Sequence, residues 1–362
     1  MAWLLAGGGW DGRILCFRPD IDEPRYVLYA AQKDHEVSMS HDIDWLSRFL
    51  ATVSVTGRLE IRCLYGAPWN ITYIDSPPGE MPYHLVIRGT AVLEPPPGGK
   101  PTTLAAGDIL LMVQGGAHVL RDVSGLPPGP VHEREALNVL LSENEGEGEP
   151  LEMLCGRFVI APPHDRWLRH YLPPTLVIRA RKSGSHDELP AANRLSRLVS
   201  LMREESADEG LGGYALLNSL SSALFALALR ASSEADAPPA GLLSLAAHPR
   251  LAPAISAMFS DPARAWTLPE LAALTHMSRA TFMRRFQEGL GRSASEFLQD
   301  IRMSLAANDL KNPGRATEVV AEAVGYQSVS AFRRVFTERI GMTPGAWRRQ
   351  FTAGAISTRS DE

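Results

Sequence analysis

Arg284 and Arg334 occupy matching positions in a sequence pattern that repeats with a shift of 50 residues. An arginine on a helix can donate two hydrogen bonds to guanine in the major groove of DNA, so a repeated arginine of this kind predicts two base contacts. The residues that recur are Ser278, Phe282, Arg284, Phe286, Gly291 and Phe297 in the first copy, and Ser328, Phe332, Arg334, Phe336, Gly341 and Trp347 in the second. Two copies of one supersecondary unit are therefore expected.

Each copy has the pattern of a helix, a tight turn and a second helix. Polar residues typical of helix N-caps precede three of these helices: Thr267, Ser278 and Thr317. Gly325 marks the turn of the second copy. Between the copies, Phe297, Ile301 and Leu305 recur every four residues and predict a connecting helix that fixes the distance between the two units.

The second helix of each copy has a polar face opposite its phenylalanines. The residues on these faces are Arg279, Met283 and Arg284 in the first copy, and Val329, Ser330, Arg333 and Arg334 in the second. If only one helix had such a face, the better interpretation would be a helical bundle whose arginines face solvent. Arg284 and Arg334 occupy matching positions in two copies, and this makes the bundle interpretation unlikely. Two such helices on a rigid connector could enter successive major grooves roughly 34 Å apart.

The distribution of charge along the chain agrees with DNA contacts in the C-terminal part. The chain of 362 residues has a formal net charge of -5, yet from Leu242 onward 15 Lys/Arg stand against 11 Asp/Glu, and the preceding part has 21 against 30. Any binding of a polyanion is therefore expected at the C-terminal end.

The three cysteines, Cys16, Cys63 and Cys155, are too few for a disulfide framework. We found neither a signal-peptide pattern nor an apolar stretch that approaches the roughly 18–20 residues needed to span a bilayer. These observations predict a cytoplasmic protein without a membrane partner.

The sequence divides into six segments. We expect residues 1–38 to be either an N-terminal extension or an arm that docks on the body. A sensor domain at 39–165 contains an amphipathic helix at 44–50, and a helical segment at 166–231 is a candidate for dimerisation. A linker at 232–241, a DNA-binding domain at 242–353 and a disordered tail at 354–362 follow. Short β-rich runs separated by Pro- and Gly-rich turns lie at 59–65, 70–74, 84–87, 109–113, 137–141 and 158–160. They favour an all-β sandwich or barrel and hence an α+β chain, with flanking helices and an all-α C-terminal domain.

A wide apolar stripe occupies the predicted helix at 214–230. Its members are Leu216, Leu217, Leu220, Leu224, Leu227 and Ala228. Dimerisation through this stripe and burial of the stripe within one chain are both compatible with the pattern.

The C-terminal part resembles the AraC/XylS family of transcriptional regulators over residues 248–351. The runs that carry the resemblance are SRATFMRRF at 278–286, VAEAVGY at 320–326 and GMTPGAWRR at 341–349. The resemblance implies that bases are contacted by Ala280, Met283, Arg284, Val329, Ser330, Arg333 and Arg334, and that Arg279 contacts a phosphate. Because Ala280 and Met283 are small or apolar, the first helix is expected to contact a thymine methyl group.

Upstream, the sequence resembles the cupin-type sensor domain of one AraC subgroup. The runs are PYHLV at 82–86, followed by Gly89, and GDILLM at 107–112, followed by GAH at 116–118. Metal-binding cupins have a His-x-His pair, a Glu and another His, but Val86 stands where the second His of the pair would be. His84 and His118 alone are weak candidates for a metal site, and no cofactor is expected.

Two cysteines are candidates for redox sensing. The runs RCLYGAPW at 62–69 and LCGRF at 154–158 resemble the cysteine positions of a hypochlorite-responsive subgroup. The alternative is that Cys63 and Cys155 are small buried hydrophobic residues. Arg157 shares a strand face with Cys155, and a nearby arginine favours thiolate, the form that oxidants attack.

These patterns predict a regulator that binds a double-stranded DNA operator and forms a homodimer. The family resemblance implies that it is an activator and works with RNA polymerase. A small molecule or an oxidant sensed in the barrel would control it, and the sequence does not identify that effector. One alternative is a cupin-type enzyme that carries a DNA-targeting module. Another is a scaffold whose barrel only dimerises.

Overall fold

The computed structural model describes residues 44–95, 99–179 and 190–357. The predicted extension at 1–38 lies outside these residues. The described part begins with helix α1 (Trp45–Thr52), whose N-cap Asp44 accepts a hydrogen bond from the backbone N–H of Ser47. This confirms the amphipathic helix expected at 44–50.

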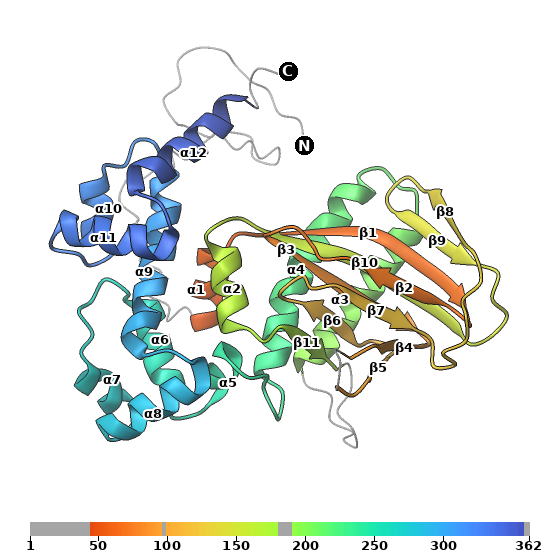
Figure 1. Cartoon of the computed structure of the whole chain (residues 1–362), viewed down its shortest axis with the longest axis horizontal. Coiled ribbons are helices and arrows are strands. Elements are labelled where there is room, and N and C mark those ends of the chain that lie inside the picture. The colour runs from red at the N-terminus through yellow and green to blue at the C-terminus, as the bar shows by residue number, and fades with distance from the viewer. Residues whose placement is uncertain (1–43, 96–98, 180–189, 358–362) are drawn as a thin grey trace, which may run out of the picture. The chain divides into compact units, whose positions relative to one another are not determined.

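Two sheets pack together as the β-rich half of the chain (Figure 1). The strands are β1 (Val55–Gly66), β2 (Asn70–Tyr73), β3 (Glu80–Arg88), β4 (Thr90–Leu93), β5 (Thr102–Ala105), β6 (Ile109–Met112), β7 (His118–Arg121), β8 (Val131–Glu135), β9 (Leu140–Asn144), β10 (Pro150–Ile160) and β11 (Thr175–Ile178). The larger sheet has the order β11-β6-β3-β10-β1-β9-β8, and the smaller sheet has the order β2-β7-β4-β5. The cupin-like barrel predicted from the sequence is confirmed.

Five of the predicted strand segments coincide with β1, β2, β3, β6 and β10. The segment at 137–141 is misplaced, because Leu137 is 64% exposed and β9 begins only at Leu140. The strands β4, β5, β7, β8 and β11 were not predicted. Each has four or five residues, which is too short for an alternating pattern to stand out.

The central strands of the larger sheet are buried on both faces. Along β10, Leu154 and Phe158 face a core that continues under the helices, which we call the outer core. Met153 and Cys155 point the other way because side chains alternate along a strand, and they face an inner core between the two sheets. The inner core consists of Cys63, Tyr65, Trp69, Val86, Ala91, Leu93, Leu104, Leu110, Met112, Leu120, Leu151, Met153 and Cys155.

Helices α3 (Pro190–Ala207) and α4 (Gly213–Ser233) pack against each other, and α4 also packs on β1. By length and composition α4 could cross a membrane, so the expectation that no apolar stretch reaches that length is wrong. Its inner face is instead buried in this structure, and the Ser222 hydroxyl of α4 accepts a hydrogen bond of 2.8 Å from the Gly57 N–H of β1. Leu217 and Leu224 are buried within the chain, whereas Leu216 is 42% exposed.

The C-terminal helices are α5 (Leu242–Ala247), α6 (Ala252–Ser260), α7 (Leu268–Leu274), α8 (Arg279–Leu290), α9 (Ala294–Leu310), α10 (Thr317–Ala323), α11 (Val329–Ile340) and α12 (Pro344–Ser357). Helices α7 and α8 form the first helix-turn-helix unit, and α10 and α11 form the second. The two units lie at opposite ends of α9, the predicted connecting helix (Figure 1). Thr267 and Ser278 are N-caps as predicted, but Thr317 is not, because Ala316 is the N-cap of α10.

Three predicted segment boundaries fall inside continuous helices. The boundary at 165 lies within α2 (His164–Tyr171), the linker start at 232 lies within α4, and the tail start at 354 lies within α12. Composition does not reveal where a helix ends, because an end depends on local backbone hydrogen bonds. Residues 358–362 of the predicted tail lie outside the described residues.

The two helix-turn-helix units differ in their cores. The first shares the outer core with the barrel, since the Phe297 ring of α9 lies 6.3 Å from that of Trp167 and 5.1 Å from that of Tyr171, both on α2. The second unit has its own core around Phe332, Phe336 and Trp347. The first unit and the sensor part therefore share one hydrophobic core, and the second unit has a core of its own.

Candidate nucleic-acid interface and barrel interior

The first candidate reading face lies on α8. Phe282 and Phe286 are buried beneath the helix, as the repeat pattern predicts. All four predicted contact residues of this helix are exposed, namely Arg279, Ala280, Met283 and Arg284. The guanidinium of Arg284 lies 3.3 Å from the Glu288 carboxylate one turn along the same exposed face, and a surface pair of this kind is weak. Arg284 is thus free to exchange that partner for a base.

The second candidate reading face lies on α11, where Ser330, Arg333 and Arg334 are exposed and Val329 is half-buried. Arg333 pairs with Glu318 of α10 at 3.2 Å. Arg334 has no hydrogen-bond or ion-pair partner within the described part of the chain. The Ser330 hydroxyl lies 2.8 Å from that of the N-cap Ser328. Of the two arginines on this face, Arg334 is therefore the one that need not give up a partner before it binds a base.

The turn before α11 is held close to the first unit. Gly325 has a φ of 84°, and a Cβ at this position would lie 2.1 Å from the carbonyl oxygen of Ala263. Arg302 of α9 donates hydrogen bonds to the carbonyl oxygens of Pro262 and Arg264, and its guanidinium lies 5.7 Å from the centre of the Tyr326 ring. These contacts explain why the position needs glycine, and they fix the N-terminal end of α11.

The repeat comparison missed one exposed cation. Arg285 follows Arg284 on α8, is exposed, and has no partner among the residues that the structure describes. Its counterpart in the second copy is Val335, which packs against the core of the second unit. A search for matching residues could not find Arg285 for that reason, whereas a search for cations on each helix separately would have found it.

The two cupin histidines meet in the inner core. His84 Nε2 lies 2.8 Å from His118 Nε2, and the Tyr73 ring lies against both imidazoles. Burial lowers the pKa of both histidines, and the proximity of His118 lowers that of His84 further. Both rings are therefore neutral near pH 7.

The hydrogen bonds determine the tautomer of each ring. His118 Nδ1 donates to the carbonyl oxygen of Gly116 at 2.9 Å, so its Nε2 carries no proton and must accept. His84 consequently donates from Nε2, and its Nδ1 is left to accept from the Cys155 thiol at 3.2 Å. The Tyr73 hydroxyl donates to the same sulfur at 3.5 Å. This chain of hydrogen bonds therefore begins at the Cys155 thiol, whose proton points at His84 Nδ1, and ends at the carbonyl oxygen of Gly116.

Cys63 and Cys155 lie on the same face of adjacent strands, since β1 pairs Cys63 with Met153 and Ile61 with Cys155. Both are buried. Burial raises the pKa of the Cys155 thiol well above its usual range, and the neighbouring Cys63 thiol adds to the shift.

The expectation that Arg157 favours a Cys155 thiolate is wrong. Arg157 is engaged by Glu60 at 2.7 Å and by Glu80 at 2.5 Å. The polar neighbour of the Cys155 sulfur is His84 instead.

The residues present do not form a metal centre of the usual kind. No group of three or more His, Cys, Asp or Glu side chains is arranged around a common point in the described ranges. His84 and His118 are brought together as the cupin motifs predict, but Val86 supplies only a buried isopropyl group to the inner core.

Comparison with known proteins places both halves of the chain. The cupin family pattern matches residues 44–234, and a helix-turn-helix domain pattern matches residues 271–350. The RCS-specific HTH-type transcriptional activator RclR of Escherichia coli strain K12 is 28% identical over 85% of this chain and 98% of its own length. The HTH-type transcriptional regulator MtrA of Neisseria gonorrhoeae is 26% identical over 85% of this chain and 99% of its own length. Among solved structures, ToxT of Vibrio cholerae O395 is 14% identical over 83% of this chain and 99% of its own, with a TM-score of 0.32.

The order of the two domains is the same in the matched patterns as in the fold, with the barrel first and the paired helix-turn-helix units last. The chain belongs to the cupin family and, with the helix-turn-helix domain that follows, it is an AraC-family transcriptional regulator.

Proposed function

We propose that this regulator binds double-stranded DNA through α8 and α11 and activates transcription. The observation that carries the proposal is that two helices present exposed arginines on faces opposite buried phenylalanines while sharing one connecting helix, α9. An exposed arginine can pair with guanine in the major groove, and a rigid connector sets the spacing of two such contacts. An activator would also contact RNA polymerase, which places its action in the cytoplasm.

Selection of bound duplexes from a randomised DNA pool tests this proposal. The recovered sequences should contain two conserved blocks whose centres lie about 10 base pairs apart, because each reading helix enters one major groove on the same side of the duplex. Binding that falls with salt but enriches no sequence would contradict base reading, since phosphate contacts alone have that behaviour.

We also propose a homodimer formed through the exposed side of α4. Leu216 and Ala223 are exposed and lie seven residues apart, which puts them on one helix face, and the half-buried Leu220 lies between them. Leu211 and Tyr214 extend the apolar surface at the start of the helix. Leu224 is fully buried and cannot belong to this surface.

Leu216→Glu combined with Ala223→Glu should halve the mass found by sedimentation and weaken binding to an operator with two sites. Both positions are exposed, so the barrel should keep its thermal stability. Ile74→Glu is the matched control, because Ile74 is exposed just after β2 of the smaller sheet, whereas α4 packs on β1 of the larger sheet, so this variant should leave the mass unchanged. Equal masses for parent and double variant would place the interface elsewhere.

For the signal, we propose oxidation of Cys155 with Cys63 as its partner. A peroxide or a hypohalous acid is a two-electron oxidant that would convert the Cys155 thiol to a sulfenic acid. The Cys63 thiol would then displace water from that sulfur to form a disulfide. His84 Nδ1 is the acceptor for the thiol proton, and the resulting imidazolium keeps its bond to His118 without turning the ring. Because both groups are neutral at rest, the reaction depends on this proton transfer.

Treatment with one equivalent of oxidant should remove two free thiols from a Cys16→Ser background and change operator affinity about tenfold, within the usual range for coupled sites. Cys155→Ser should abolish the response, and His84→Gln should slow the loss of thiols. A parent that keeps its thiols, or serine variants that respond as the parent does, would make both cysteines packing residues.

A further inference from the structure

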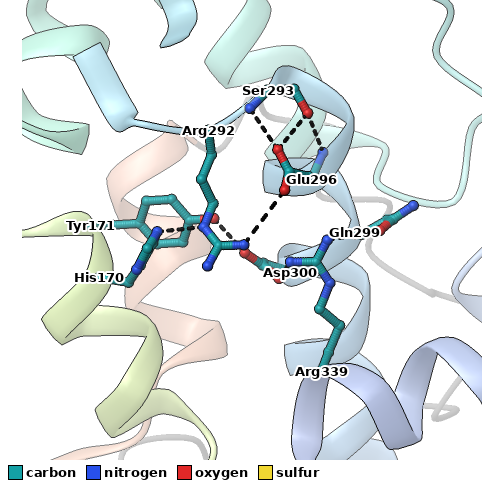
Figure 2. Close-up of polar contacts among 8 residues, drawn as sticks. All are labelled: His170, Tyr171, Arg292, Ser293, Glu296, Gln299, Asp300 and Arg339. Carbon is teal, nitrogen blue, oxygen red and sulfur yellow. Dashed lines mark hydrogen bonds and ion pairs between the residues drawn. The ribbon is translucent and has the colours of Figure 1, made fainter. Parts of the chain in front are cut away.

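Asp300 lies at the centre of a polar network that joins α2, α9 and α11 (Figure 2). Arg339 of α11 donates from Nη1 to Asp300 Oδ1 at 3.1 Å and from Nη2 to Gln299 Oε1 at 3.1 Å. The Tyr171 hydroxyl, at the end of α2, donates to the other oxygen, Asp300 Oδ2. One carboxylate on the connecting helix thus holds the last turn of the second reading helix and the last turn of a sensor-side helix.

The groups in this network are shielded enough for their bonds to matter. The Arg339 and Asp300 side chains are 17% and 14% exposed, and Tyr171 is buried. Hydrogen bonds to a charged group are about twice as strong as neutral ones, and removal of one partner leaves the other poorly compensated. Burial and the Asp300 carboxylate raise the pKa of Tyr171, so its hydroxyl remains a donor.

A second contact ties the same helix to the start of α9. Arg292 donates from Nε to His170 Nε2, and Figure 2 shows this contact beside the Tyr171–Asp300 bond. Burial and the charge of Arg292 lower the pKa of His170, which suits a neutral acceptor. His170 and Tyr171, neighbours on α2, therefore form hydrogen bonds at the beginning and in the middle of the connecting helix.

The second unit shares no apolar core with the barrel among the described residues. Its core is distinct from the outer core that the first unit shares with the sensor part. The N-terminal end of α11 is fixed by Gly325 and Tyr326 against residues of the DNA-binding domain itself. A cavity of about 420 Å³ lined by α2, α9 and α11 borders the network and leaves room for Arg339 to take another position.

We propose that Tyr171 is a positioning residue for DNA reading: through Asp300 and Arg339 it sets the orientation of α11 relative to α8. Loss of the Tyr171–Asp300 bond would free α11 to change its orientation and what the second unit reads, while the aromatic contacts of α2 with Phe297 keep the first unit in place. The proposal rests on the proposed function, in which α8 and α11 contact bases.

Tyr171→Phe in the full chain is the test, because it removes one oxygen atom and keeps the ring in its aromatic contacts. Duplexes selected by the parent serve as probes, and Arg284→Ala and Arg334→Ala identify the blocks read by α8 and α11. Tyr171→Phe should lower affinity about fivefold or more and flatten base preference in the α11 block alone. Tyr83→Phe is the matched control, since it loses a buried hydroxyl bonded to Ser221 at 2.7 Å, far along the chain from both reading helices.

A double-mutant cycle with Arg339→Gln supplies a second measurement. If Tyr171 acts through Asp300 and Arg339, the losses in the α11 block should not add. Unchanged preference in both blocks for Tyr171→Phe, equal flattening of both, or additive losses would overturn the proposal while leaving the DNA-reading function intact. A parent that selects no sequence at all would reject the proposed function itself.

Discussion

Arg334→Ala is expected to weaken binding to a selected duplex by about 1–3 kcal/mol and to relax preference at one base pair. Arg334 is exposed on α11 and has no partner among the residues that the structure describes, so its guanidinium can meet a guanine without first giving up another contact. Titration of a labelled duplex, followed by fluorescence anisotropy, gives the affinity for the selected sequence and for each substituted base pair.

Arg279→Ala is the contrasting variant for this prediction. Arg279 is the first residue of α8 and is expected at a phosphate, so its loss should weaken selected and random duplexes alike. It should also lower the slope of log affinity against log salt by about one unit. If Arg334→Ala causes the same loss on selected and random DNA, Arg334 contacts a phosphate and the assignment of α11 as a base-reading helix is wrong.

Phe297→Ala should lower the free energy of unfolding by about 3–5 kcal/mol, the usual cost of removing a buried aromatic side chain. The Phe297 ring lies within 6.3 Å of the rings of Trp167, Tyr171, Phe259 and Phe286. Because this cluster is part of the outer core, the substitution should destabilise the barrel and the first unit together. Hydrogen exchange should show faster opening of α6 to α8 and of the strands that face the outer core.

Phe336→Ala is the matched control for Phe297→Ala. Phe336 is equally buried but belongs to the separate core of the second unit, so faster exchange should be confined to α10, α11 and α12. If Phe297→Ala leaves the exchange of β10 and β3 unchanged, the barrel and the first unit do not share one cooperative core.

The helix-turn-helix units were predictable because their signals are local. In the first copy, the cap Ser278, the buried pair Phe282 and Phe286 and the C-terminal Gly291 all belong to α8 or adjoin it, and Gly341 adjoins α11 in the same way. The same residue types recur 50 positions later, so the helix-turn-helix pattern is supported by two copies. Thr317 was assigned wrongly because a threonine at the first helical position has the same sequence context as one at the N-cap.

The barrel interior was predictable only in part, because its contacts are made by strand pairing between distant segments. The motifs named His84 and His118, but their 2.8 Å contact and the link from His84 to Cys155 depend on the packing of β7 against β3 and on the register of β3 with β10. Sequence alternation placed Cys155 opposite Leu154 correctly and gave no sign that both faces of β10 are buried. The expected role of Arg157 was wrong because Glu60 and Glu80 engage its guanidinium and because burial raises the pKa of the Cys155 thiol.

The network around Asp300 had no signal in the sequence. Tyr171, Asp300 and Arg339 lie on three helices, and each looks like an ordinary surface residue when its own helix is considered alone. Only the docking of α2 against α9 brings them together.

Base reading by α8 and α11 is tested in the cell by mapping which DNA segments the protein occupies in its host, for the parent and for an Arg284→Ala, Arg334→Ala double variant. If both helices read bases, the parent occupies a small set of promoter segments that share two blocks about 10 base pairs apart, and the double variant loses these sites. Occupancy spread without a common sequence, or sites retained by the double variant, would contradict the claim that α8 and α11 read DNA.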